Sequence, residues 1–407
     1  MNRVSAALGI MCSLALLACG RTGTDSATHT FRTYRQAGVR IAETGIGPKY
    51  DGELFTYEPV LQLQQVEENP DSYLRYPAGF LQGEDNCYYI PDPGNHRIAV
   101  FDSEGRYLRA FGQEGEGPGD LQSFNLQSIT GNILEVFDYS LQRLTRFRTD
   151  GSLVEVIQLP RSSESRQACY VLADGRKVLI EYIDPWIPGP QNAVWHRGLV
   201  LDADDDTLNV IETDPVANSF RHGPGLRAGT PIPYSVRPIC VWVAGRGFLT
   251  GRGEEPVLEW FDLEGRCSSR IVLDVPPDEI SPELRRSIEA RYDRSVERAT
   301  GQLREFAKQQ REGLIIPEAK GWWTDLQIDS AGFIWLSKAT AMWEYTLPTV
   351  CRVLSPEGEY LGDTTLPAGR VRFQDGLLMG MVTDEETDEE IPTVFRIVPA
   401  VAGLDYQ

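Results

Sequence analysis

The sequence predicts an all-β protein, a six-bladed β-propeller in which each blade is a four-stranded antiparallel sheet. Three observations favour this fold. A hairpin pattern recurs along the chain, another pair of short strands precedes each hairpin, and the last unit ends before its outer strand. A ring of sheets that is closed by a strand from the N-terminal part of the chain accounts for all three.

The recurring unit is a strand, a turn and a second strand, with apolar residues alternating on both sides of the turn. Its clear copies are "RIAVFDSEGRYLRAFG", "LTRFRTDGSLVEVIQL", "VLEWFDLEGRCSSRIVL" and "VCRVLSPEGEYLGDTTL", with turn glycines Gly105, Gly151, Gly265 and Gly358. A weaker copy, "GLVLDADDDTLNVIET", turns near Asp206. Gly105 and Gly151 are 46 residues apart, and a four-stranded blade takes about 40–50 residues.

The second strand of each blade is predicted by a short apolar segment ahead of the hairpin. These segments are "CYYIPD", "NILEVFD", "RKVLIEYI", "GFLTGRG", "GFIWLSKA" and "GLLMGMVTD". The missing outer strand of the last blade is expected from "YDGELFTYEPVLQLQQ", near residues 51–65, or from "GVRIAET" before it. Closure of the ring by that strand removes the exposed sheet edges. The propeller is therefore expected to span residues 38–407.

An α-helical insertion is predicted at about 278–312, between blades 4 and 5. Ser281 is a credible N-cap and Pro282 suits the first helical position. Apolar residues at helical spacing form one stripe, and Gly301 is a possible break into two helices. The stripe consists of Ile280, Leu284, Ile288, Tyr292, Val296, Leu303 and Phe306. The insertion either packs as a cap over one propeller face or serves as a mobile lid or partner-binding element.

The N-terminus predicts export. Residues 1–18 combine a positive charge, an apolar stretch too short to span a bilayer, and small residues before a cleavage point. The ending "LLAC" resembles the signals of bacterial lipoproteins, which implies lipid attachment at Cys19; the alternative is an ordinary signal cut near Ala18. Residues 19–37 are expected to form a flexible tether. The expected location is the bacterial cell envelope, on a membrane through the lipid and facing the periplasm or cell surface.

Composition narrows the choice of partners. The formal net charge of −20 disfavours binding to nucleic acid. Beyond Cys19 the chain has five scattered cysteines without C-x-x-C spacing, so neither a zinc site nor any cofactor is expected. Most of these cysteines lie in apolar strand segments and are expected to pack as small buried hydrophobic residues.

A glycine-rich loop follows the first hairpin in "DPGNHRIAVFDSEGRYLRAFGQEGEGPGD". A phosphate site would require a helix after these glycines, but Pro118 and the strand-like "LQSFNLQSIT" follow, so the loop is interpreted as a tight crossing between blades. The segment resembles an NHL repeat, and the chain resembles six-bladed β-propeller lipoproteins of bacteria whose function is unassigned. Asn95 and Arg97 are expected to form turn hydrogen bonds and a polar link between neighbouring blades.

Catalytic signals are weak. The chain has no G-x-S-x-G elbow and four histidines, of which His196 and His222 could meet on one face. Similar architectures include metal-dependent lactonases and lyases, which need several ligands at the central channel. The acidic run 384–390 lacks the spacing of a calcium loop and is interpreted as a solvated hairpin loop. No catalytic or metal-binding residue is therefore assigned.

Two long loops near the third blade are the best candidates for recognition, because long loops on a rigid scaffold commonly bind ligands. They span residues 185–196 and 220–235. The candidate ligand-binding residues are Trp186, Trp195, His196, Arg221, His222 and Arg227. The expected function is binding or scaffolding of a protein, peptide or glycan. The alternatives are a metal-dependent hydrolase or lyase with its site in the central channel, and a structural component of the envelope.

Overall fold

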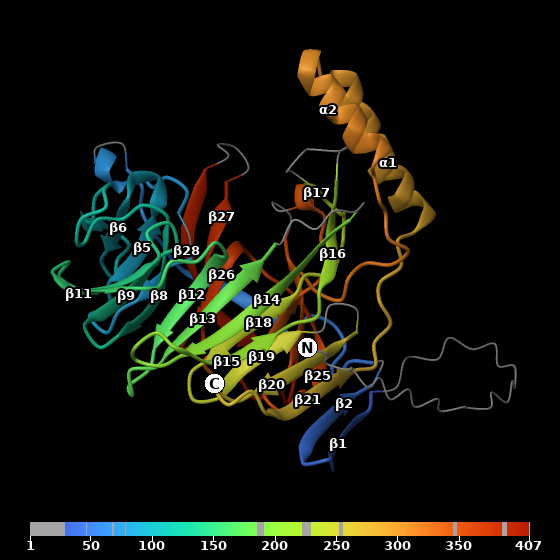
Figure 1. The fold of residues 1–407 in the computed structure, drawn as a ribbon, viewed down its shortest axis with the longest axis horizontal. Coiled ribbons are helices and arrows are strands. Elements are labelled where there is room, and N and C mark those ends of the chain that lie inside the picture. Colours follow the sequence, from blue (N-terminus) through green and yellow to red (C-terminus); the bar gives the residue numbers. More distant parts are fainter. Residues whose placement is uncertain are drawn as a thin grey trace, which may run out of the picture.

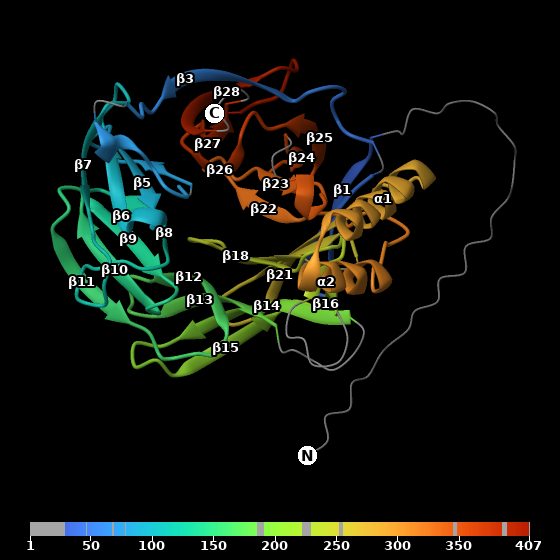
Figure 2. The ribbon, with the colours of Figure 1, turned by 90° about the horizontal axis from the view of Figure 1, so that it is seen from above.

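The prediction of a six-bladed β-propeller is confirmed. The computed structural model describes residues 29–45, 47–66, 69–77, 79–184, 191–221, 229–251, 255–344, 348–384 and 389–406. Six sheets are arranged in a ring around a central axis, as seen from above in Figure 2. The first strand of each blade faces this axis and the fourth lies at the rim, and the six predicted second strands all occupy the second position.

The first three blades follow in chain order. Blade 1 contains β4 (Leu81–Gln82), β5 (Tyr88–Asp92), β6 (Arg97–Phe101) and β7 (Tyr107–Phe111). Blade 2 contains β8 (Phe124–Thr130), β9 (Ile133–Asp138), β10 (Arg143–Arg148) and β11 (Leu153–Gln158). Blade 3 contains β12 (Ser165–Val171), β13 (Lys177–Ile183), β14 (Gln191–Leu201) and β15 (Thr207–Glu212), and β14 also pairs with an extension made of β16 (Val216–Arg221) and β17 (Gly229–Pro231).

The other three blades complete the ring. Blade 4 contains β18 (Ile239–Val243), β19 (Gly247–Gly251), β20 (Val257–Phe261) and β21 (Cys267–Leu273), followed by β2 (Val39–Thr44) and β1 (Phe31–Gln36). Blade 5 contains β22 (Asp325–Ile328), β23 (Ile334–Ser337), β24 (Val350–Leu354) and β25 (Tyr360–Thr365). Blade 6 contains β26 (Gly369–Gln374), β27 (Leu377–Thr383), β28 (Glu390–Pro399) and β3 (Phe55–Gln62). Short 3-10 helices are η1 (Pro70–Ser72), η2 (Pro93–Asn95) and η3 (Met342–Glu344).

The predicted turn glycines all adopt the left-handed backbone conformation. Their φ angles are +79° at Gly105, +90° at Gly151, +75° at Gly265 and +94° at Gly358. At Gly105 an added Cβ would lie 2.5 Å from the Gln62 carbonyl oxygen, so both the turn and the approach of β3 require glycine. In the weak third-blade copy Asp205 takes this place, with φ +71°. A short polar residue tolerates this conformation better than a bulky one.

Ring closure distinguishes the two candidate strands. β3 pairs antiparallel with β28 from Phe55↔Pro399 to Gln62↔Thr393, so the segment near residues 51–65 supplies the outer strand of blade 6. The alternative segment, "GVRIAET", forms β2 instead and pairs parallel with β21 of blade 4. Its hairpin partner β1 lies within residues 19–37, so part of the segment that was expected to be a tether is a strand. Pairing with a sheet edge satisfies backbone groups that a free tether would leave to water.

Hydrophobic clusters fill the space between neighbouring blades. Trp335 of β23 is 1 % exposed and stacks on Phe373 of β26 and Phe55 of β3, with ring centroids 4.4 and 5.1 Å away. Its indole nitrogen donates a hydrogen bond to the Asp329 carboxylate at 2.9 Å. The expected burial of cysteine is confirmed for three residues, Cys169, Cys240 and Cys351.

The helical insertion lies where it was predicted, as α1 (Pro282–Arg298) and α2 (Gly301–Glu312) between blades 4 and 5. The Ser281 hydroxyl accepts the Leu284 amide at 3.1 Å, which confirms the N-cap, and Gly301 has φ +56° at the break. The expected stripe is only half buried: Ile288 and Tyr292 pack against Ile232 and Tyr234, whereas Leu303 is 70 % exposed. Figure 1 shows the hairpin projecting from one side of the ring, beside β16 and β17. α1 therefore packs on the connection between β17 and β18, and neither the expected cap over a propeller face nor the alternative of a lid is decided by these contacts.

The glycine-rich loop is a crossing between blades, as predicted. It leads from β7 to β8, and no helix begins there. The Arg143 guanidinium donates to the carbonyl oxygens of Glu116, Gly117 and Asp120 at 2.7–2.9 Å. These hydrogen bonds attach the loop to the start of the third strand of blade 2, so the glycines shape a connection between blades.

Asn95 and Arg97 have the predicted structural roles. The Asp92 carboxylate accepts from the Asn95 amide at 2.8 Å and from the Arg97 guanidinium at 2.9 Å. Arg97 also donates to the carbonyl oxygens of Asp71 and Tyr73, which lie in the connection from blade 6 to blade 1. Arg97 and Arg143 are each the first residue of the third strand of their blade, and each donates hydrogen bonds to the connection that leads into that blade.

Candidate binding site at the channel mouth

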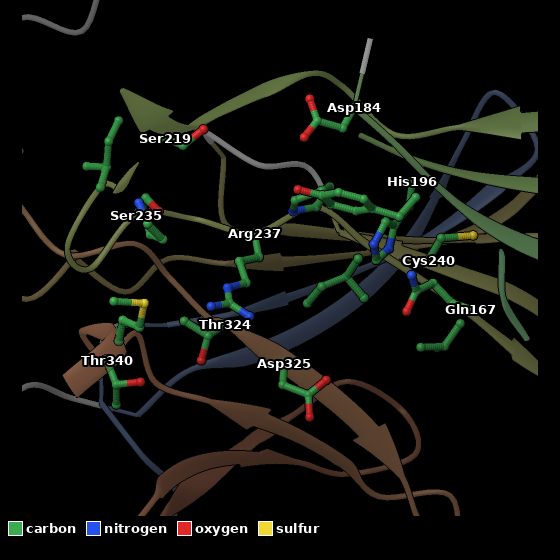
Figure 3. A pocket seen from close by; sticks show the side chains of 17 residues that line it. Gln167, Asp184, His196, Ser219, Ser235, Arg237, Cys240, Thr324, Asp325 and Thr340 are labelled. Atoms are coloured by element: carbon green, nitrogen blue, oxygen red, sulfur yellow. The ribbon is translucent and has the colours of Figure 1, made fainter. Parts of the chain in front are cut away.

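A cavity of about 590 Å3 opens at one end of the central channel. Its walls come from the starts of the inner strands β12, β18 and β22, from the end of β13, and from the connection between β17 and β18. His196 of β14 and Ser219 of β16 line it from within their strands. Figure 3 shows the side chains of blade 3 on one side of this cavity, Thr324 and Asp325 of blade 5 on the other, and Arg237 between them. Neighbouring strands of a blade are antiparallel, so the end of one strand lies beside the start of its neighbour.

His196 lies on the blade 3 wall. It is directly opposite Tyr182 in the β13–β14 register, and the two rings meet edge to face with centroids 5.6 Å apart. No hydrogen bond reaches its buried Nδ1 from the described residues. Burial lowers the pKa of His196 from 6.5 to about 4, because the cation loses hydration. The imidazole is therefore neutral at pH 7.

The depressed pKa of His196 predicts a loss of stability in acid. The unfolded chain takes up a proton at this side chain near pH 6.5, whereas the folded protein does so near pH 4. The free energy of unfolding therefore falls as the pH decreases between these values. Between pH 7 and pH 4 we expect the free energy of unfolding of His196→Gln to fall by about 2–3 kcal/mol less than that of the native protein, because glutamine takes up no proton. Urea unfolding at pH 7, 5.5 and 4 measures it.

A control for this prediction is Thr207→Gln, at an exposed position of β15 outside the cavity. The difference in unfolding free energy between this control and the native protein is expected to stay constant with pH, because neither threonine nor glutamine titrates. Parallel pH profiles for His196→Gln and the native protein would contradict the assignment of a buried neutral imidazole.

Arg237 carries the only arginine or lysine charge among the described residues that line the cavity. It belongs to the connection between β17 and β18, and its side chain is exposed to the channel. No hydrogen bond or ion pair joins its guanidinium to another described residue. An arginine within a concave site and without a partner is available to bind an anion.

Asp325 is the first residue of β22. Water reaches its carboxylate through the channel, yet the walls enclose it. This enclosure raises the pKa of Asp325, while hydrogen bonds from Leu326 and Gln327 and the charge of Arg237 act in the opposite direction. A cation that replaces the lost hydration would favour the ionised form.

The connection that carries Arg237 is held firmly. Tyr234 is 2 % exposed, has φ +57°, and donates its hydroxyl hydrogen bond to the Glu344 carboxylate at 2.5 Å. Its carbonyl oxygen accepts the Gly321 amide at 2.7 Å, and the Lys320 ammonium lies 4.6 Å from the ring centroid. These contacts join the connection to blade 5 and the insertion, and so fix the position from which Arg237 extends.

A second channel arginine, Arg372 of β26, differs from Arg237 because its donors are occupied. It reaches across to β8 and donates to the carbonyl oxygens of Leu126 and Gln127. Enclosure in the channel lowers its pKa. Its side chain passes Gly79, where an added Cβ would lie 2.6 Å from the Arg372 Cγ. Arg372 therefore fills the channel in front of blade 1 and has a structural role.

The structure places only part of the predicted ligand-binding set. His196 lines the cavity, whereas Trp195 does not, because neighbouring residues on β14 point to opposite faces. Arg221 ends β16, but its side chain is outside the described part of the structure. Cys19, Trp186, His222 and Arg227 lie outside the described residues altogether.

Sequence reasoning missed Arg237 and Asp325. Each has a weak local signal: Arg237 stands just before an apolar inner strand, and Asp325 is a charged residue that opens one. Their meeting depends on the ring, which brings residues of different blades to one channel. The acidic run 384–390 joins β27 to β28, and its residues 385–388 are outside the described residues.

No group of three or more His, Cys, Asp or Glu side chains in the described part of the chain is placed to hold a metal ion. None of the helices in that part is long and apolar enough to cross a membrane.

Comparisons with known proteins support the fold. The model of a family described as a 6-bladed beta-propeller (DUF5128) matches residues 70–178. A protein of Bacteroides fragilis, described as exported, has a solved structure with a TM-score of 0.50 and 13 % identity, over 88 % of this chain and 99 % of that one. No curated protein matches the chain.

Two further solved structures are similar at lower scores. A member of the DUF4221 family from Bacteroides vulgatus has a TM-score of 0.45 and 11 % identity, over 86 % of this chain and 99 % of that one. A streptogramin B lyase has a TM-score of 0.40 and 10 % identity, over 84 % of this chain and 97 % of that one. At such identities the likeness concerns the fold alone, and function has to be argued from the site.

Proposed function

We propose that this protein is a lipid-anchored binding protein of the bacterial cell envelope, which holds a short peptide at the mouth of its propeller channel. The observation that carries the proposal is the cavity of about 590 Å3 that contains Arg237, whose guanidinium makes no hydrogen bond or ion pair with the described residues. Ligand sites are typically cavities of about 300–1,000 Å3 with a few convergent polar groups. This one lies on a rigid ring, which keeps such groups in place before a ligand arrives.

The sequence supports the location. Residues 1–18 have the features of an export signal, and Cys19 follows them at the position of lipid attachment in lipoproteins. The similar protein of Bacteroides fragilis is described as exported. We also propose that the blades are of the NHL type, because Asp92, Asn95 and Arg97 form in blade 1 the contacts that the repeat motif predicts.

A peptide fits the cavity better than a glycan does. Sugar sites usually offer aromatic faces, whereas Tyr182 is the only aromatic ring apart from His196 among the described lining residues. The cavity instead contains charges of both signs, Arg237 and the carboxylates of Asp184 and Asp325. The metal-dependent hydrolase or lyase has no ligand set among the described residues through which to act.

The test is calorimetric titration of the chain from residue 20 onward with trialanine and, separately, with maltotriose. We expect saturable binding of trialanine. Thr340 is an exposed residue of the cavity wall, and Thr340→Trp should weaken binding at least about ten-fold because the ring fills the space. Thr207→Trp, at an exposed position of β15 outside the cavity, is the matched control and should bind normally.

Three outcomes would overturn the proposal. Trialanine could fail to bind at millimolar concentration, maltotriose could bind in its place, or both tryptophan variants could bind as well as the native protein. About one tightly bound calcium or zinc ion per chain, measured by mass spectrometry, would instead favour the metal-dependent enzyme.

A further inference from the structure

We propose that the cavity recognises the two free ends of a di- or tripeptide, with Arg237 binding the terminal carboxylate and Asp325 the terminal ammonium. This inference rests on the proposed function and specifies its ligand. It assigns one charged group of the cavity to each end of a zwitterion.

Arg237 is the group suited to the carboxylate. A guanidinium presents a planar set of N–H donors that matches the two oxygens of a carboxylate. Its donors make no hydrogen bond with the described residues, in contrast to those of Arg372, Arg143 and Arg97, which bind carbonyl oxygens. Tyr234 and its contacts hold the connection that precedes Arg237, so little order has to be created on binding.

Asp325 is the group suited to the ammonium. Its carboxylate lies in the enclosed channel, where a partner that is charged and donates hydrogen bonds replaces lost hydration. Arg237 is near enough to act on Asp325 electrostatically, yet no nitrogen–oxygen contact within ion-pair distance joins the two. The two opposite charges are thus close but separate, as the ends of one short zwitterion require.

No other described residue of the cavity wall is assigned to either role. His196 is neutral at pH 7, so Arg237 is the only full positive charge among them. Asp184 already takes part in an interaction. An extended chain spans about 3.5 Å per residue, which puts the ends of a di- or tripeptide about 7–10 Å apart. We expect a ligand of this length to lie between Arg237, which precedes blade 4, and Asp325, which opens blade 5.

The test combines blocked ligands with substitutions in the full chain. The probes are trialanine with free ends, N-acetyl-trialanine and trialanine amide, titrated by calorimetry. In the native protein we expect each blocking group to weaken binding about 10- to 100-fold, as the loss of a charge-assisted pair does. Arg237→Gln should weaken the binding of free trialanine to the same degree. It should bind trialanine amide as the native protein does, because the amide has no terminal carboxylate for Arg237 to bind. Asp325→Asn should behave in the same way toward N-acetyl-trialanine.

Arg396→Gln is the matched control, because Arg396 is an exposed arginine of β28 outside the cavity. It should bind all three probes as the native protein does. Near-ultraviolet circular dichroism of each variant shows whether the fold is retained, which we expect because Arg237 makes no bond to a described residue.

The outcomes separate the two proposals. If the native protein binds all three probes equally, or if Arg237→Gln weakens free and amidated trialanine alike, the assignment of the two ends is wrong while peptide binding stands. If no peptide binds the native protein, the proposed function itself is wrong. Equal binding of trialanine by Arg237→Gln and the native protein would also overturn the role of Arg237.

Discussion

Removal of β3 is expected to prevent the protein from folding. A chain that begins at residue 63 lacks β1, β2 and β3. The loss of β3 exposes the edge of β28, along which Phe395 and Ile397 are buried in the native protein, and the loss of β2 exposes the edge of β21. The shortened chain also loses Leu54 and Phe55, which are 0 and 2 % exposed in the core between blades 5 and 6. Truncation of such side chains costs about 2–5 kcal/mol each, against a net stability of about 5–15 kcal/mol.

The measurement is thermal unfolding followed by circular dichroism, with size-exclusion chromatography to detect aggregation through the open edge. A chain that begins at residue 38 is the control, because it keeps β2 and β3 and β1 is the one described strand that it lacks; five of the six residues of β1 are exposed. That chain should unfold cooperatively near the native temperature. Cooperative unfolding of the shorter chain at the same temperature would show that β3 is not needed for closure.

Substitution of Trp335 should cause a large loss of stability. Trp335→Ala removes a ring that is 1 % exposed and that stacks on Phe373 and Phe55. It also removes the hydrogen bond to Asp329, a buried carboxylate whose pKa burial raises. We expect a decrease of about 3–5 kcal/mol in the free energy of unfolding, measured by urea titration.

Trp335→Phe separates the two contributions. Phenylalanine keeps most of the ring packing but cannot donate to Asp329, so the expected loss is about 1–3 kcal/mol. Asp329 still accepts the Phe333 amide at 2.8 Å, which limits the cost. A loss as large as that of Trp335→Ala would show that the hydrogen bond dominates, and no loss in either variant would contradict the packing that the structure shows.

The local features of the fold were predictable because neighbouring residues encode them. Alternating apolar residues on each side of Gly105 and Gly151 specify hairpins, and the left-handed φ of both glycines explains why glycine stands there. Ser281 and Pro282 specify the start of α1 in the same local way. The number of blades follows from counting such units.

Pairings between distant segments were not predictable in this way. Two early segments both alternate like strands, and only the closed ring shows that β3 pairs with β28 while β2 pairs with β21. The apolar stripe of the insertion predicted helices but not that Leu303 would remain exposed. Register and burial on a face depend on the partner segment, which periodicity does not identify.

The blade repeat, the turns and the helical insertion could be predicted because each depends on residues within one short segment. The strand that closes the ring and the charges that meet in the channel depend on contacts between distant segments. Arg237 and Asp325 are far apart in the chain, one in the connection that leads into blade 4 and the other at the start of blade 5. They share one cavity because ring closure turns the inner strands of separate sheets toward a common axis, and no local pattern records that meeting.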